Sequence, residues 1–166
     1  MEFTFILKYR LPDTGTDAGS LEQRLADAGC DDALLGIGRP GRLALEFCRQ
    51  AASAREAVLS ALADVQRAVP DAELIEVSPD LVGLTDVADL LGMSRQNMRK
   101  LLLAHPQTFP APVHEGSASI WHLADILSWM QARGSQKVSS ELAELAAAAL
   151  QINVAKEQER LISHPG

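Results

Sequence analysis

The chain lacks the features that mark several classes of protein. Only two of its 166 residues are cysteines, Cys30 and Cys48, and they do not form the Cys-x-x-Cys spacing of a metal or redox site. We expect two free, buried thiols in a reducing cytoplasm. The apolar runs are short and interrupted by polar residues, so none is expected to span a bilayer. The first residues carry no cationic lead before their apolar run, which argues against a signal peptide.

Catalytic motifs are missing as well. The sequence contains no Gly-x-Ser-x-Gly elbow and no P-loop, and its clustered glycines fall in a predicted hairpin instead of opening a helix. The histidines show neither the i,i+4 helical spacing nor the cysteine neighbours of a zinc site: His105, His114, His122 and His164. We therefore expect no enzyme activity, no cofactor and no metal.

Positive charge is scarce, since 15 Lys and Arg stand against 22 Asp and Glu, a net charge of −7. Residues 1–80 hold 8 basic and 14 acidic residues, residues 81–134 hold 4 of each, and residues 135–166 hold 3 and 4. Because phosphate repels an acidic surface, residues 1–80 are a poor candidate for contact with nucleic acid. The neutral middle segment predicts only modest non-specific binding to nucleic acid. Sequence-specific binding would therefore require two or more copies of the segment that contacts the bases.

The composition nevertheless predicts a folded protein. Apolar residues make up 47% of the chain, too many for a mainly disordered one, and the length suits about one or two small domains. We divide it into residues 1–80, residues 81–134 and a C-terminal helical segment, residues 135–166. The fold class expected is α+β.

The first 80 residues predict four strands and two helices in the order β-α-β-β-α-β. Alternating apolar residues and turn signals mark the strands, and capping boxes mark the helix starts. The predicted strands are Phe3–Tyr9, Ala33–Ile37, Arg42–Cys48 and Leu74–Val77, and the predicted helices open at Ser20 and Ser53. This order is that of a ferredoxin-like domain, in which the first strand lies beside the third and fourth and both helices cover one face.

Such a fold hosts sensing, RNA binding and dimerisation, so it does not name a function. Phe3, Phe5 and Tyr9 have the spacing of an aromatic RNA platform, but equally that of core residues, and the core is the favoured interpretation. Asp31 and Asp32 beside Cys30 suit a cation or ligand site, although a solvated acidic turn explains them more simply.

Residues 84–102 predict two short helices joined by a tight turn at Gly92. Thr85 and Ser94 are the expected N-caps. Apolar residues at three- and four-residue spacing face inward: Val87, Ala88, Leu91, Met98, Leu101 and Leu102.

The second of these helices turns a polar, cationic face outward. Arg95 and Arg99 form one row, and Gln96 and Lys100 form the next. Arginine can bond the O6 and N7 atoms of guanine, glutamine can bond adenine, and lysine makes phosphate contacts. The alternative is a buried helical hairpin with a solvated cationic face.

The residues around this stretch carry a family resemblance. Ala88, Gly92, Met98 and Leu101 occupy the small, turn and apolar positions of a helix-turn-helix, and Phe109–Val113, Ile120–Ile126 and Trp129 follow. Residues 81–134 thereby resemble the AlpA/excisionase branch of the MerR-like winged helix-turn-helix regulators. The resemblance implies a recognition helix at 94–103 in the major groove and a wing at 113–121 on flanking backbone. The implied DNA-binding residues are Ser94, Arg95, Gln96, Asn97, Arg99, Lys100, His114 and Ser117.

The rest of the chain predicts a wing and two more helices. Val113-His114 and residues 119–121 can pair across a short turn, where Glu115 opposes phosphate contact by His114 and Ser117. A helix from Leu123 to Ala132 follows, with Trp121 and Trp129 as packing residues. A longer helix spans Ser139 to Ile162, and its apolar seam can serve packing on its own domain or dimerisation: Leu142, Leu145, Ala149 and Ile152.

These patterns predict a sequence-specific protein for double-stranded DNA, a cytoplasmic bacterial transcriptional regulator that acts as a homodimer. A small-molecule or protein effector of the N-terminal domain is possible on this interpretation. Two alternatives stay open. One is an excisionase-like or packaging protein that bends or marks DNA. The other is a protein-interaction or sensor module that does not bind DNA directly.

Overall fold

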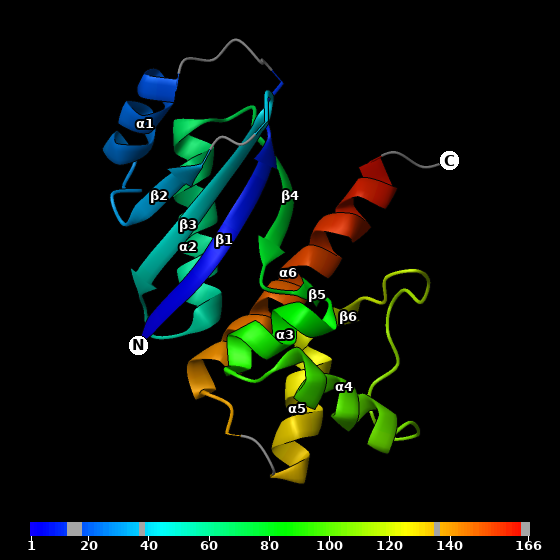
Figure 1. The fold of residues 1–166 in the computed structure, drawn as a ribbon. Coiled ribbons are helices and arrows are strands. Elements are labelled where there is room, and N and C mark those ends of the chain that lie inside the picture. The colour runs from blue at the N-terminus through cyan, green and yellow to red at the C-terminus, as the bar shows by residue number, and fades with distance from the viewer. Residues whose placement is uncertain (13–17, 37–38, 135–136, 164–166) are drawn as a thin grey trace. The chain divides into compact units, whose positions relative to one another are not determined.

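A computed structural model describes residues 1–12, 18–36, 39–134 and 137–163 (Figure 1). In these residues the protein is a mixed α+β structure with six helices and a four-stranded antiparallel sheet. It divides into two compact units: residues 1–78 with 151–166, and residues 79–150. The last helix, α6 (Ser140–Ser163), contributes its first part to the second unit and its remainder to the first.

The first unit is built on the four-stranded sheet. Its strand order is β2-β3-β1-β4, so the first strand does lie between the third and the fourth, as predicted. Every neighbouring pair is antiparallel, and Leu7 is opposite both Leu45 and Val77. The strands are β1 (Glu2–Arg10), β2 (Ala33–Gly36), β3 (Arg42–Gln50) and β4 (Glu73–Ser78). Ile37, predicted in the second strand, lies outside the described residues.

Alternation along the strands sends one set of side chains toward the helices α1 (Ala18–Asp27) and α2 (Ala54–Ala68), which contact each other. The Phe5 and Phe47 rings stack at 5.4 Å between centroids. The helix α2 begins as predicted, because Ser53 accepts a hydrogen bond from the Glu56 N–H at 3.1 Å. The predicted start of α1 at Ser20 is wrong: the helix already includes Ala18, since a capping pair is only a local preference.

The aromatic residues of β1 belong to the core. Phe3 and Phe5 are 1% exposed and Tyr9 is 5% exposed. The core interpretation is therefore confirmed, and an RNA-stacking platform made of these three rings is ruled out, because no base can reach them. The Tyr9 hydroxyl has no hydrogen-bond partner among the described residues. Burial is the main reason that the pKa of Tyr9 is raised.

The other face of the sheet carries polar and charged side chains, with ion pairs between Lys8 and Glu76 and between Arg10 and Glu73. Cys48 belongs to this face and is exposed, so the prediction of two buried thiols is wrong for it. Phe47 takes the inward position of β3, and the next residue must then point outward. Cys30 is buried as predicted, both thiols are free, and burial raises the pKa of Cys30 to about 11.

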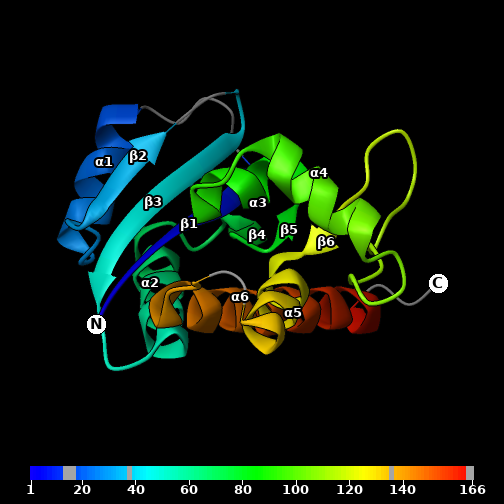
Figure 2. The ribbon, with the colours of Figure 1, turned by 60° about the horizontal axis from the view of Figure 1, so that its bottom comes forward.

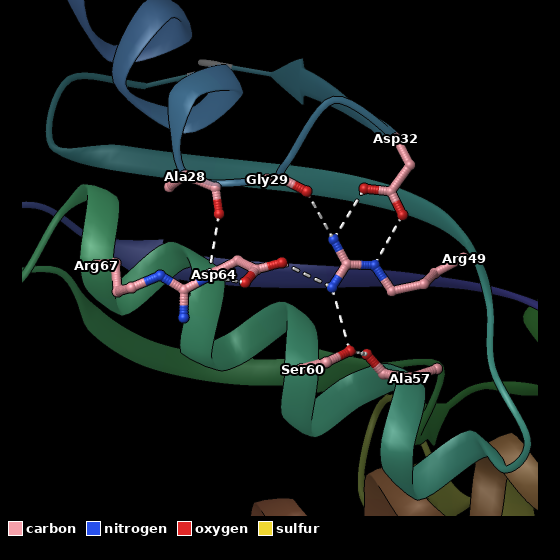
Figure 3. Close-up of polar contacts among 8 residues, drawn as sticks. All are labelled: Ala28, Gly29, Asp32, Arg49, Ala57, Ser60, Asp64 and Arg67. Atoms are coloured by element: carbon pink, nitrogen blue, oxygen red, sulfur yellow. Dashed lines mark hydrogen bonds and ion pairs between the residues drawn. The ribbon is translucent and has the colours of Figure 1, made fainter.

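Arg49 links three segments of the first unit through a group of contacts that we call the Arg49 cluster (Figure 3). Its guanidinium donates to both carboxylate oxygens of Asp32, at 2.7 and 2.9 Å, and to Asp64 at 2.9 Å. It also donates to the Ser60 hydroxyl at 3.2 Å and to the Gly29 carbonyl at 3.1 Å. Asp32 is thus committed to an ion pair, which contradicts a cation or ligand site at that residue.

The outer edge of β4 is covered by side chains of α6. Asn153 accepts a hydrogen bond from the Val77 N–H at 2.8 Å and donates one to the Val77 carbonyl at 2.9 Å. Lys156 donates to the Ile75 carbonyl. These side chains replace the hydrogen bonds that a further strand would supply, so this edge is closed to strand addition.

The second unit contains α3 (Leu84–Leu91), α4 (Arg95–Ala104), α5 (Leu123–Arg133), the first part of α6 and a two-stranded sheet. That sheet pairs β5 (Leu81–Val82) with β6 (Trp121–His122), a pairing that the sequence analysis did not anticipate. The inward residues predicted for α5 are all buried: Leu123, Ile126, Leu127 and Met130.

The apolar seam predicted on the C-terminal helix is covered by the chain itself. Leu145 and Ala149 are buried, Ile152 is half-buried, and Leu142 packs against the core of the second unit. Ser139 caps the helix as predicted, since its hydroxyl accepts from the Leu142 N–H at 3.1 Å. None of the helices in the described ranges is long and apolar enough to cross a membrane.

We predict that Arg49→Ala lowers the free energy of unfolding by roughly 2–4 kcal/mol, because Asp32 loses its cationic partner and Asp64 keeps only its ion pair with the exposed Arg67. The Arg49 and Asp64 side chains are only 12% and 15% exposed. Urea unfolding at neutral pH measures the change. The matched control is Arg10→Ala, whose ion pair with Glu73 is about 60% exposed and should contribute less than about 1 kcal/mol. Equal losses in the two variants would contradict a structural role for the cluster.

The Asp32–Arg49 pair should also make stability depend on pH. The hydrogen bond from Arg49 lowers the pKa of Asp32 in the folded protein, so this stabilisation is complete above the pKa of an unfolded aspartate. It is lost as the pH falls through the lower, folded value. Urea titrations of the wild type and Asp32→Asn should therefore differ at pH 7 and converge in acid. A difference that stays constant with pH would refute this coupling.

Candidate nucleic-acid interface

The helices α3 and α4 are joined by a three-residue turn, visible in Figure 2. Gly92 ends α3 in the left-handed conformation, with φ of 67°. Ser94 then caps α4, because its hydroxyl accepts a hydrogen bond from the Asn97 N–H at 3.1 Å. Both residues take the roles predicted from the sequence.

The start of α3 differs from the prediction, which made Thr85 its N-cap. The N-cap is Gly83, and the Asp86 carboxylate accepts a hydrogen bond from the Gly83 N–H at 2.9 Å. Val82 is held in β5 opposite Trp121, so the chain enters the helix directly after that strand and Thr85 falls inside the first turn.

One side of α4 is held in the core of the second unit. Met98 is completely buried, and Leu101 and Leu102 pack partly against the same core, as predicted. Phe109 lies edge-on to Trp121 and Trp129, with centroids 5.9 and 5.0 Å away. These contacts confirm the two tryptophans as packing residues.

The opposite side of α4 is exposed and cationic. All six residues predicted here as DNA-binding are solvent-exposed: Ser94, Arg95, Gln96, Asn97, Arg99 and Lys100. Within the described ranges, Arg95, Arg99 and Lys100 form no ion pair with an acidic side chain. Their donors are therefore not committed to a carboxylate, which leaves them available to an anionic partner.

The predicted wing is a short hairpin between α4 and α5. His114 and Ile120 form an antiparallel bridge, in which the Ile120 N–H donates to the His114 carbonyl at 2.9 Å. His114 in this bridge and Ser117 in the turn are both exposed, as is Glu115. A Cβ atom at Gly116 would lie 2.9 Å from His114 Nε2, so glycine lets the imidazole lie close over the turn. The wing therefore carries both predicted residues, alongside an acidic one.

Sequence reasoning missed the residues that anchor the wing. Asp80 is 1% exposed, and its carboxylate is 2.7 Å from His122 Nδ1, while its carbonyl accepts from the Leu123 N–H at 2.7 Å. The sequence analysis placed Asp80 at the end of the first segment, residues 1–80. An acidic residue directly before an apolar run was the available signal, but its histidine partner is 42 residues away.

A second unpredicted contact lies at the end of α5. The Arg133 guanidinium is 4.8 Å from the Trp129 ring centroid and 2.7 Å from His105 Nε2. Because a guanidinium can only donate, Nε2 of His105 is the acceptor. This contact ties the residue after α4 to α5, so it supports the position of α4 without belonging to its outward face.

Comparisons of the chain with protein-family models, with curated proteins and with solved structures found no match. The described residues contain no group of three His, Cys, Asp or Glu side chains that could hold a metal ion.

We predict that Gly92→Ala destabilises the protein by about 1–2 kcal/mol, since a left-handed backbone costs a side chain with a Cβ atom about that much. No atom lies within 4 Å of the position where that Cβ would stand, so crowding adds nothing. Gly92→Asn should cost less, because asparagine tolerates this conformation. Thermal or urea unfolding measures the stability of both variants. An alanine variant as stable as the wild type would contradict the left-handed conformation of Gly92.

Proposed function

We propose that this protein binds double-stranded DNA sequence-specifically, with α4 in the major groove and the wing at residues 113–121 on the flanking backbone. The observation that carries the proposal is the division of α4 into a fully buried side at Met98 and an exposed side with three cations and two amides. A helix of this length, about 15 Å, fits the major groove, and these side chains suit base edges and phosphate.

The fold assignments that accompany this proposal are finer than the α+β class. We infer that the first unit is a ferredoxin-like domain, supported by its strand order and its two helices. We infer that the second unit is a winged helix-turn-helix related to the AlpA/excisionase group of MerR-like regulators. The turn at Gly92, the cap at Ser94 and the hairpin at His114 support that assignment.

One such helix reads only a few base pairs, too few for specificity in a genome. The protein is therefore proposed to act as a homodimer on two half-sites, as bacterial transcriptional regulators do. Half-sites one helical turn apart place the two recognition helices about 34 Å from each other.

The decisive first experiment is selection of fragments of the source genome by the purified full-length protein at low salt. Enrichment of a repeated motif supports the proposal and supplies the half-site spacing. Enriched sites outside promoters, with bent DNA in circular-permutation gels, would indicate an architectural role instead. If no fragment is enriched and a protein partner is retained on pull-down, the interaction-module alternative replaces DNA binding.

On the selected site, Arg95→Ala and Arg99→Ala should each weaken binding by about 1–3 kcal/mol and relax the preference at one base position. Fluorescence anisotropy on the selected duplex and on single-base variants measures both effects. The matched control is Arg24→Ala, which removes an exposed arginine from α1 and should leave affinity unchanged. A uniform loss on every duplex would make the residue a phosphate contact, and no loss in either variant would contradict the assignment of α4.

A further inference from the structure

The two edges of the main sheet are treated differently. The edge of β4 is covered by Asn153 and Lys156, whereas the opposite edge is β2, a strand of four uncharged residues. Proteins protect exposed edges with short strands, charges or prolines; β2 is short, but it carries neither a charge nor a proline. Leu34 in this strand is 73% exposed.

The register shows which backbone groups of β2 point outward. The Cys48 N–H donates to the Asp32 carbonyl at 3.2 Å, and Ala33 is opposite Phe47. Backbone direction alternates along a strand, so Leu34 and Gly36 are bonded to β3, while Ala33 and Leu35 face away from it. The Ala33 N–H is used by the Cys30 carbonyl. The Leu35 N–H and carbonyl have no partner among the described residues.

We propose that β2 pairs antiparallel with β2 of a second copy, about a two-fold axis between the two Leu35 residues. Each Leu35 N–H then donates to the other copy's Leu35 carbonyl. Leu34 faces Gly36 of the second copy, and this glycine leaves space for the leucine side chain. The pairing is isologous, as a two-fold dimer requires, and joins the two sheets into one.

Charges at the two ends of β2 complement each other in this arrangement. Antiparallel pairing brings the Asp31 end of one strand to the Arg39 end of the other. Both residues are exposed, and neither forms an ion pair with a described residue. Opposite charges therefore lie toward each end of the paired strands, which favours antiparallel pairing over parallel pairing.

The inference names the interface of the homodimer in the proposed function, but its test needs no DNA. Sedimentation velocity of the full chain over a concentration series should show a dimer that dissociates on dilution, because the interface is small. Leu34→Lys should be monomeric, and its lysine is opposite Glu46 within the monomer, which favours folding. The matched control is Ile162→Lys on α6, since Ile162 is also 73% exposed. It should remain dimeric.

A wild type that is monomeric at every concentration overturns the interface, as does a dimer dissociated by Ile162→Lys but not by Leu34→Lys. Charge exchange gives an independent check. Asp31→Arg or Arg39→Asp should each weaken the dimer at least several-fold, and the double variant should restore it. Failure of the double variant, with a native circular dichroism spectrum, also overturns the pairing. Arg99→Ala should lose DNA affinity and stay dimeric, which separates failure of the interface from failure of DNA binding.

Discussion

The proposed interface depends on the burial of one side of α4. A helix of ten residues is barely stable in water by itself, so its position is set by the surface on which it packs. Met98 has no exposed surface, and the aromatic group of Phe109, Trp121 and Trp129 belongs to the same core. Since the inward side is held by this packing, the direction of Arg95 and Arg99 is determined as well.

Other contacts hold the segments around that core and in the first unit. The Asp80–His122 pair and the β5–β6 ladder attach the start of the second unit to the strand that leaves the wing. The Arg49 cluster plays the corresponding role in the first unit, where it joins the loop after α1, β3 and α2. These contacts join charged or polar groups that are far apart in sequence. They hold segments outside the apolar core in place.

Much of the secondary structure was predictable because its signals are local. The helix α2 begins where Ser53 indicates, and Gly92 and Ser94 mark the turn before α4. Two of the errors share one origin, which is competition between local preference and the neighbouring strand. Thr85 is a good cap, but β5 brings the chain into the helix earlier, and Cys48 points outward because Phe47 fills the inward position.

The sequence by itself determined the order of the elements, the apolar sides and the polar residues on α4, since each depends on spacing within a few residues. Only the tertiary structure decided which distant residues meet. Arg49 finds Asp32 and Asp64, and Asn153 finds Val77, 76 residues away along the chain. No periodicity encodes such pairs, because their approach depends on how strands and helices close on one another. The exposed edge of the main sheet at β2 was likewise not predictable from the sequence, because it depends on which strand lies at each edge and on what covers it.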